Sequence, residues 1–281
     1  MTAIFWADEA DYLYAQGKYD EAIGFYDRAI KAAPKDAKLW NSRGLDLCHL
    51  GRYEEAIESF GKALEIDPEY VDAWNNRGVV LYKQEKYAEA IRYFDEIIDM
   101  HPEYVRAWYN KGVVYGKIGN YLEAINHYDR TLELNPGGAK VWSNKGASLG
   151  FLGRYDEAVF CFDKAIELDS ENAGAWNNKG AAYGKLGRYD EAMVCFERSI
   201  EKDPMQSEVW YNKGEALRRQ DKYAEAIVQF DKAIEIDPAY SKAWNSKGLA
   251  LKALGRDAEA DAAFAEAAAK ESDMSAGRDH F

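Results

Sequence analysis

Apolar residues recur along the chain at intervals of three and four, a spacing that places them on one face of a helix. In the stretch from Ala173 to Pro204, Trp176 and Tyr183 belong to one such run, Gly187 interrupts it, and a second run of the same spacing follows. Glycine and proline both stop helices. Each such stretch therefore predicts two consecutive helices, each with one apolar face.

The two-helix pattern is repeated with a period of 34 residues. The eight tryptophans follow this period, at Trp6, Trp40, Trp74, Trp108, Trp142, Trp176, Trp210 and Trp244. All six prolines share one phase of it, at Pro34, Pro68, Pro102, Pro136, Pro204 and Pro238. We number each repeat so that Trp is position 4 and Pro is position 32, and the repeats then start at residues 3, 37, 71, 105, 139, 173, 207 and 241. One helix pair cannot bury both of its sides, so neighbouring pairs must stack into a solenoid.

The motif Trp-x2-(Lys/Arg)-Gly-x2-(Leu/Tyr), followed by Tyr-x-Glu-Ala, Phe and Pro, resembles the tetratricopeptide repeat (TPR) over residues 3 to about 271. The resemblance implies an all-α fold, a right-handed superhelical solenoid of eight antiparallel helix pairs. The first helices would line a concave groove, and the second helices would form the convex back. We expect one solenoid over residues 1–271 and a disordered tail over residues 272–281, where the periodicity stops.

Some repeats depart from the family pattern. Position 7, usually Leu in the family, is Lys or Arg here, and we expect the aliphatic stem to cover the packing surface while the charge reaches water. The first repeat carries Asp8 and Asp11, and the last carries Asp257 and Asp261, at positions that differ from the other repeats. These carboxylates would supply the polar outer face that a terminal repeat needs.

Composition narrows the class of protein. The formal net charge of −13 argues against attraction of the whole surface to nucleic acid or to anionic lipid. No apolar run is long enough to span a membrane, and the first residues lack the basic segment of a secretory signal. Three cysteines without C-x-x-C spacing indicate a reducing compartment. We therefore expect a cytoplasmic protein.

No group of residues has the spacing that catalysis requires. The four histidines fall at unrelated phases of the repeat, and none pairs with a cysteine at metal-ligand spacing. Cys161 and Cys195 share a phase in adjacent repeats, and we interpret them as packing residues. The sequence predicts no enzyme, no metal site and no cofactor.

The TPR resemblance assigns positions 2, 5, 6, 9, 12 and 13 of the first helices to the concave groove. A row of asparagines occupies position 6, at Asn76, Asn110, Asn144, Asn178 and Asn212. An amide offers both a donor and an acceptor, so this ladder can bind the backbone of an extended peptide. The alternative is that the amides bond to neighbouring helices and hold the stack in register.

Three further sets of groove residues stand out. Glycines at position 12 would form a low groove floor, or would make room for position 5 of the next repeat: Gly116, Gly150 and Gly184. Basic residues outnumber acidic ones in the groove: Lys38, Lys83, Arg106, Lys117, Lys140, Lys185, Arg218 and Arg219. Aromatic residues could anchor a ligand there: Tyr82, Tyr109, Phe151 and Tyr211.

These features predict a monomeric, non-catalytic scaffold that binds an extended, acidic segment of another protein in its groove. The lysine and asparagine pattern with which chaperone-tail-binding members of the family hold a terminal carboxylate is absent. Self-association through the ends of the solenoid is the alternative. A nucleic-acid partner is disfavoured by the acidic surface and the absence of an arginine-rich stripe.

Overall fold

The computed structural model describes residues 2–276, which form sixteen helices and no strand. The chain divides into two compact units, residues 1–136 and 137–281. The first unit contains α1 (Ala3–Ala15), α2 (Tyr19–Ala32), α3 (Ala37–His49), α4 (Tyr53–Ile66), α5 (Val71–Lys83), α6 (Tyr87–Met100), α7 (Val105–Lys117) and α8 (Tyr121–Leu134). The second contains α9 (Ala139–Phe151), α10 (Tyr155–Leu168), α11 (Ala173–Lys185), α12 (Tyr189–Lys202), α13 (Ser207–Arg218), α14 (Tyr223–Ile236), α15 (Ser241–Ala253) and α16 (Asp257–Ala276).

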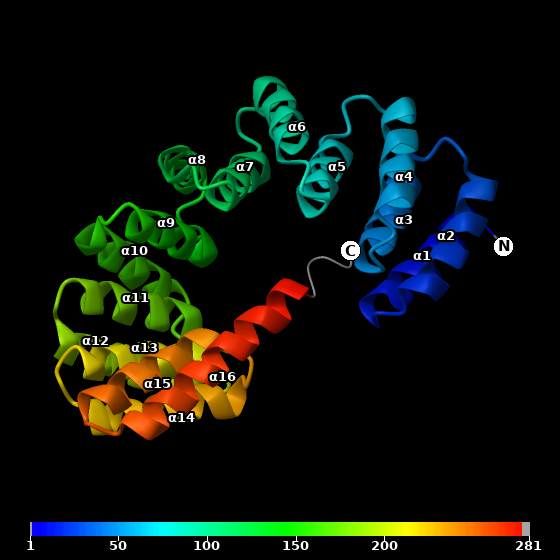
Figure 1. Cartoon of the computed structure of the whole chain (residues 1–281). Coiled ribbons are helices and arrows are strands. Elements are labelled where there is room, and N and C mark those ends of the chain that lie inside the picture. Colours follow the sequence, from blue (N-terminus) through cyan, green and yellow to red (C-terminus); the bar gives the residue numbers. More distant parts are fainter. Residues whose placement is uncertain (1, 277–281) are drawn as a thin grey trace. The chain divides into compact units, whose positions relative to one another are not determined.

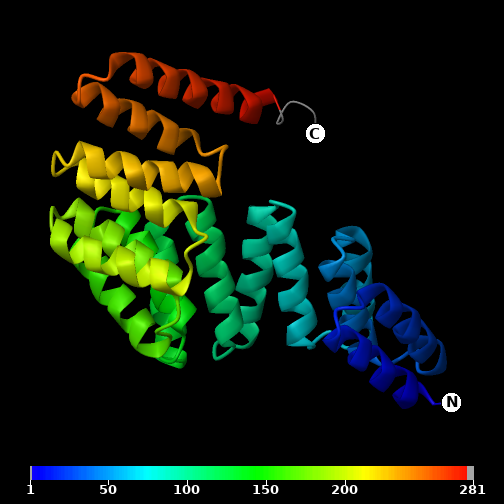
Figure 2. The same ribbon diagram turned by 90° about the horizontal axis from the view of Figure 1, so that it is seen from below.

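Each repeat is an antiparallel pair of helices, and successive pairs stack within each unit (Figures 1 and 2). The helices end near the predicted stops at positions 15 and 32, apart from α16. The fold is therefore an all-α repeat solenoid. No helix among residues 2–276 combines the length and the apolar character needed to cross a membrane.

The two helices of a pair approach closely at position 8. A Cβ placed on Gly44 would lie 2.5 Å from the ring of Phe60, and one placed on Gly248 would lie 2.6 Å from the ring of Phe264. The phenylalanine at position 24 thus fills the space that glycine leaves, and Phe60 is completely buried. This pairing explains why Gly and Phe recur together through the repeats.

The tryptophans at position 4 donate hydrogen bonds to the backbone carbonyl of position 32 of the preceding repeat, which is a proline in most repeats and Ser170 in one. The indole N–H of Trp74 donates to the carbonyl oxygen of Pro68 at 2.8 Å, and Trp108 and Trp210 donate to Pro102 and Pro204 at 2.9 Å. The proline ends one repeat, and the tryptophan lies in the first helix of the next. This bond fixes the connection between consecutive repeats, a role that the sequence pattern alone does not reveal.

The turn inside each pair needs a left-handed residue. Gly119 has φ +82° and Gly187 has φ +75° at position 15, where glycine avoids the steric penalty of a Cβ. Glu85 and Asp221 occupy the same position in two other repeats with φ 60° and 59°. Those two turns are therefore strained.

The expectation that position 7 sends its charge into water is wrong in most repeats. Arg43 binds Asp27 at 2.8 Å and Lys247 binds Asp231 at 2.7 Å, each carboxylate lying at position 25 of the preceding repeat. The same pairing joins Lys111 to Asp95, Lys179 to Asp163, and Lys213 to Glu197. Burial opposes the charge on Lys179, but the hydrogen-bonded Asp163 carboxylate raises the pKa of that ammonium above its ordinary value. The cations thus hold neighbouring repeats together.

Arg77 is the exception, because position 25 of the preceding repeat is Gly61. Its guanidinium lies over the ring of Tyr93 at 5.1 Å, and its buried Nε has no hydrogen-bond partner among residues 2–276. One link in the row of ion pairs between repeats is missing.

The terminal repeats differ from the expectation in detail. The first repeat exposes apolar as well as acidic side chains, since Ile4 is 73% and Tyr12 is 65% exposed. Helix α16 continues to Ala276, beyond the end expected at residue 271. The remainder of the expected tail, residues 277–281, lies outside the described residues.

Candidate functional site

Within each unit, the odd-numbered helices form an inner layer. Helix α5 contacts both α3 and α7, and α9, α11, α13 and α15 contact one another in succession. The even-numbered helices pack mainly on their odd-numbered neighbours. We call the exposed side of the odd-numbered helices the inner face, and it carries the residues that the sequence analysis assigned to the groove.

Most of the asparagine ladder has an internal partner. The side-chain N–H of Asn76 donates to Oδ1 of Asn41 at 2.9 Å, and Asn110 and Asn212 donate in the same way to Asn75 and Asn177 at 2.8 and 3.0 Å. Each acceptor lies at position 5 of the preceding repeat. These three amides therefore join neighbouring helices, as the alternative interpretation proposed, although each keeps a further N–H and its own oxygen for other bonds.

Asn178 behaves differently from Asn76, Asn110 and Asn212. Position 5 of the preceding repeat is Ser143, whose side chain is shorter than asparagine, and the Asn178 side chain has no hydrogen bond within residues 2–276. It is half-buried and lines a pocket. Asn144, also half-buried, accepts a bond at its backbone carbonyl from Ser148.

The position-12 glycines leave open space. A Cβ on Gly150 or on Gly184 would meet no atom within 4 Å, and one on Gly116 would make only ordinary contacts, the nearest at 3.6 Å to the Tyr128 hydroxyl. The suggestion that Gly150 and Gly184 make room for a neighbouring side chain is therefore wrong. Glycine inside a helix costs about 0.8–1 kcal/mol relative to alanine. Nothing in the packing offsets that cost at these two positions.

Two adjoining pockets lie on the inner face of the second unit. The first, which we call the apolar pocket, has a volume of about 400 Å³ and is lined by Gly146, Ala147, Gly150, Phe151, Tyr155, Phe162, Asn178, Ala181, Ala182 and Lys185. The second, which we call the charged pocket, has a volume of about 170 Å³ and is lined by Ala181, Gly184, Lys185, Phe196, Tyr211, Asn212, Glu215, Ala216 and Arg219. They share Ala181 and Lys185, so Lys185 stands between them.

The predicted basic residues fall into two groups. Arg106 binds Asp72 at 3.4 Å, Arg218 binds Glu215 at 3.0 Å, and Lys83 lies 5.9 Å from the ring centroid of Tyr53. The others are exposed and form no ion pair with any described residue: Lys38, Lys117, Lys140, Lys185 and Arg219. Although burial opposes ionisation of Glu215, the hydrogen bonds to it and the nearby arginines lower the pKa of its carboxyl group. Of the exposed lysines and arginines, only Lys185 and Arg219 line these pockets.

Three of the four predicted aromatic anchors are half-buried in the packing. Tyr82 contacts Tyr87, with 5.9 Å between ring centroids. Tyr109 packs against Tyr128 at 6.2 Å, and Tyr211 packs against Phe230 and Tyr240 at 6.1 and 5.2 Å. Phe151 is 71% exposed at the mouth of the apolar pocket. Tyr155 also lines that pocket, although the sequence pattern does not predict it, because position 17 belongs to the second helix of the pair.

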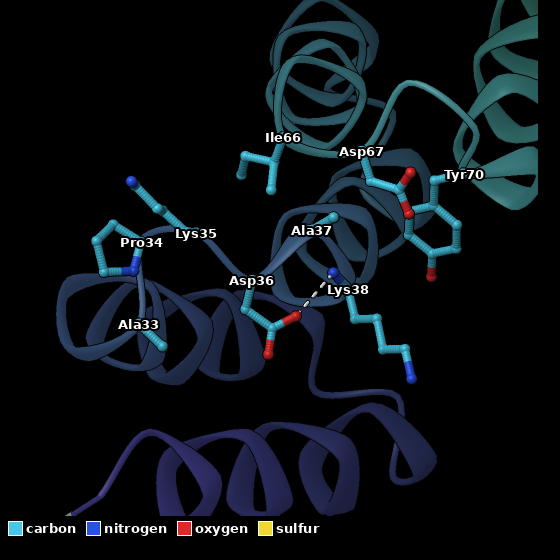
Figure 3. A pocket seen from close by; sticks show the side chains of 9 residues that line it. All are labelled: Ala33, Pro34, Lys35, Asp36, Ala37, Lys38, Ile66, Asp67 and Tyr70. Atoms are coloured by element: carbon cyan, nitrogen blue, oxygen red, sulfur yellow. Dashed lines mark hydrogen bonds between the residues drawn. The ribbon is translucent and has the colours of Figure 1, made fainter.

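A third pocket, of about 750 Å³, lies elsewhere, at the loops that follow α2 and α4 (Figure 3). The Asp36 carboxylate there accepts a hydrogen bond from the backbone N–H of Lys38 at 3.0 Å and thereby caps α3. Its lining includes two lysines and two aspartates, whose formal charges sum to zero: Lys35, Lys38, Asp36 and Asp67. The predicted groove residue Lys38 thus lies beside this loop pocket, far in sequence from the apolar pocket.

Two buried titratable residues belong to neither pocket. Asp46 is fully buried, and neither of its oxygens has a hydrogen-bond partner in the described part of the chain. Burial, followed by the charge of Asp11, raises the pKa of its carboxyl group to about 7. His127 stacks on Tyr115, and burial, followed by the charge of Lys111, lowers the pKa of its imidazole to about 4. Among residues 2–276, no three His, Cys, Asp or Glu side chains gather as metal ligands would.

Comparison with protein families identifies the class. A TPR repeat model matches residues 44–85, and tetratricopeptide repeat models match residues 3–36, 25–58, 75–139, 139–172, 173–205, 207–240 and 230–262. The chain belongs to the tetratricopeptide repeat family. This fold is that of a protein–protein interaction scaffold. No curated protein matches the chain.

Solved structures share the fold. A tetratricopeptide repeat protein from Parabacteroides merdae is 19% identical with a TM-score of 0.66, over 89% of this chain and 98% of that one. YrrB, a TPR protein with an unusual peptide-binding site, is 25% identical with a TM-score of 0.57, over 68% of this chain and 98% of its own. A chain of the Cut9–Hcn1 hetero-tetramer of the APC/C is 18% identical with a TM-score of 0.71, over 86% of this chain and 48% of its own.

Proposed function

We propose that this protein is a non-catalytic scaffold whose inner face binds an extended, acidic segment of another protein. The observation that carries the proposal is the open space over Gly150 and Gly184, bordered by the unpaired groups of Asn178, Lys185 and Arg219. Backbone can approach closely where side chains are absent, and an amide can bond to it regardless of sequence. The two unpaired cations favour an acidic ligand.

The residues that line the two pockets also favour a binding role. Among the pocket residues, the one carboxylate, Glu215, is held by Arg218, and no histidine or cysteine lines either pocket. The sequence and the inner face together favour binding over chemistry. YrrB supports the proposal as a relative with a peptide-binding site, and we infer the same kind of ligand here.

The test is to pan a phage-displayed library of short random peptides against the full chain and against the double variant Lys185→Glu/Arg219→Glu. Both residues are on the surface, so the variant should fold normally. We expect the wild type to enrich acidic peptides and the variant to lose them. Enrichment that is no better than on bare resin, or that is the same for both proteins, would contradict the proposal.

Asn178 gives a second and more local test. Asn178→Ala should weaken binding of the selected peptides without changing stability, because its amide bonds to no other residue within 2–276. The matched variant Asn212→Ala should lower stability, because it removes the bond to Asn177. Binding that is unaffected by Asn178→Ala would remove the amide from the site.

Self-association is the remaining alternative, and the exposed Ile4 and Tyr12 are its supporting observation. Sedimentation equilibrium over a wide concentration range distinguishes the two. We expect a monomer throughout. A concentration-dependent mass that Tyr12→Ser abolishes would favour assembly through the first repeat.

A further inference from the structure

The apolar pocket and the charged pocket differ in chemistry although they adjoin. The apolar pocket lies between α9 and α11, with Ala147, Phe151 and Ala181 on its walls and Tyr155 from α10 beside them. Its volume of about 400 Å³ lies near the lower end of the range for ligand pockets and accommodates one large side chain. The charged pocket is smaller and has Glu215, Arg219 and the shared Lys185 on its walls.

The space in the apolar pocket exists because small residues line it. Gly146 is closed over by Phe162, so a Cβ there would lie 2.8 Å from that ring, whereas a Cβ on Gly150 would meet nothing within 4 Å. The missing side chain at Gly150 therefore opens space toward the pocket and not toward the core. Phe151, which follows it, is the most exposed phenylalanine among the described large apolar residues.

Charge defines the other half of the site. Lys185 and Arg219 form no ion pair within residues 2–276, while Arg218 neutralises Glu215. The charged pocket therefore has a local excess of positive charge on a protein whose formal net charge is −13. An unpaired cation beside an apolar hollow is complementary to a carboxylate that neighbours an apolar group.

We infer that the apolar pocket takes a single large apolar side chain, of the leucine or phenylalanine type, from a bound peptide, and that an acidic residue next to it in that peptide reaches Lys185 and Arg219. The ligand class is thus an extended peptide in which a large apolar residue adjoins a carboxylate, with the Asn178 amide available to its backbone. This inference rests on the proposed function and adds to it a requirement for the apolar residue, which a purely acidic ligand would lack.

The variant Gly150→Leu tests the inference directly. Leucine fills the pocket from its floor and favours helix over glycine, so α9 should be preserved or stabilised. The matched control is Gly24→Leu on α2, an exposed helical glycine where an added Cβ would also meet nothing within 4 Å, outside both pockets. Phe151→Ser is a second variant, and it removes one exposed pocket wall without touching the core.

The experiment combines the phage-displayed library of short random peptides with affinity measurements on the selected peptides. We expect the enriched peptides to share a large apolar residue beside Asp or Glu. Replacing that apolar residue by Ser should weaken binding to the wild type about tenfold or more, the loss of one buried apolar side chain. Gly150→Leu should bind the original peptide as weakly as the wild type binds the Ser peptide, and Gly24→Leu should bind like the wild type.

The possible failures are distinguishable. Enrichment of acidic peptides without a shared apolar residue, or full-strength binding by both Gly150→Leu and Phe151→Ser, overturns this inference and leaves the proposed function standing. Absence of any enrichment overturns both. Enrichment of apolar peptides without a carboxylate overturns both the pairing with Lys185 and Arg219 and the acidic character of the proposed ligand.

Discussion

Asp46 occupies position 10, where the next two repeats have Val80 and Val114. All three side chains are buried, but the Asp46 carboxylate lies near Asp11 and has no hydrogen-bond partner among the residues that the structure describes. A buried charge without a partner is destabilising, and the carboxyl group responds by holding its proton to a higher pH. At the scale of single residues, the departures from the repeat are thus the places where the chain has lost an interaction or a good packing partner.

Asp46 should make stability depend on pH. Its pKa is about 7 in the folded chain, and the ordinary value for Asp is about 3.9 in the unfolded chain. The folded state therefore binds more protons between these values, and stability falls as the pH rises through that window. Asp46→Val should raise the free energy of unfolding by roughly 2–4 kcal/mol at pH 8 and by much less at pH 4. Urea denaturation of both proteins at each pH measures this; a constant difference would contradict it. His127, whose pKa is lowered, makes stability rise with pH, but it does so in both proteins and therefore cancels from the difference between them.

Arg77 lacks the carboxylate partner that most other position-7 cations have, because position 25 before it is Gly61. Gly61→Asp should supply it, since a Cβ at Gly61 would meet nothing within 4 Å. We expect a gain of about 1–2 kcal/mol in the free energy of unfolding, part from the ion pair and part from replacing a helical glycine. The control Gly61→Ala measures the gain from helix propensity alone. If Gly61→Asp is no more stable than Gly61→Ala, the ion pair with Arg77 does not form.

Two of the three glycines of helix α11, Gly180 and Gly184, have opposite roles. Gly180 at position 8 faces Phe196, whose ring would lie 2.6 Å from an added Cβ, whereas Gly184 at position 12 faces open space. At the scale of the element, the same residue type serves close packing on one side of the helix and an open surface on the other. Both glycines have the same helix propensity, and they differ only in whether the neighbouring helix packs against them.

This contrast predicts opposite effects on stability. Gly184→Ala should stabilise the protein by about 1 kcal/mol through helix propensity and reduced freedom of the unfolded chain. Gly180→Ala should destabilise it by about 1–3 kcal/mol, because the methyl group forces Phe196 to move. Chemical denaturation of the two variants makes the comparison on one helix, and effects of equal sign would contradict it.

The turn between α5 and α6 is a second element-scale case. Glu85 adopts φ 60°, a conformation that glycine tolerates and that most repeats assign to glycine. Glu85→Gly should therefore stabilise the protein by about 1 kcal/mol. The reverse change Gly119→Ala, at φ +82°, should destabilise it by a similar amount. Thermal unfolding of the two variants and the wild type measures these opposite changes in stability.

The whole molecule combines a strongly acidic composition with locally unpaired cations on the inner face of one unit. The net charge is −13, yet Lys185 and Arg219 are exposed and unpaired among the described residues. The proposed acidic peptide would be repelled by the net negative charge and attracted by Lys185 and Arg219, so these charges would determine where it binds more than how tightly it binds.

Peptide binding should therefore weaken with salt. Raising the ionic strength from about 0.1 M to about 1 M shortens the screening length from about 10 Å to about 3 Å and should reduce the affinity of selected acidic peptides several-fold. The double variant Lys185→Gln/Arg219→Gln should bind more weakly and show little salt dependence. Fluorescence anisotropy measures the peptide affinity of each protein at each ionic strength. An equal salt dependence in the two proteins would show that the peptide binds away from Lys185 and Arg219.

By itself, the sequence determines the helix pairs, their period of 34 residues and the TPR family. It does so because the residues that end each helix and those that pack against its neighbour recur at fixed positions. Their local spacing is enough to predict the helices. The interactions between repeats depend instead on which residues of neighbouring repeats meet. That is why Asn76, Asn110 and Asn212 pair with position 5, why position 7 binds carboxylates, and why Asn178 beside Ser143 is left without a partner. The tertiary structure alone decides that the space over Gly150 and Gly184 is open, since an open surface and a packed one carry the same glycine.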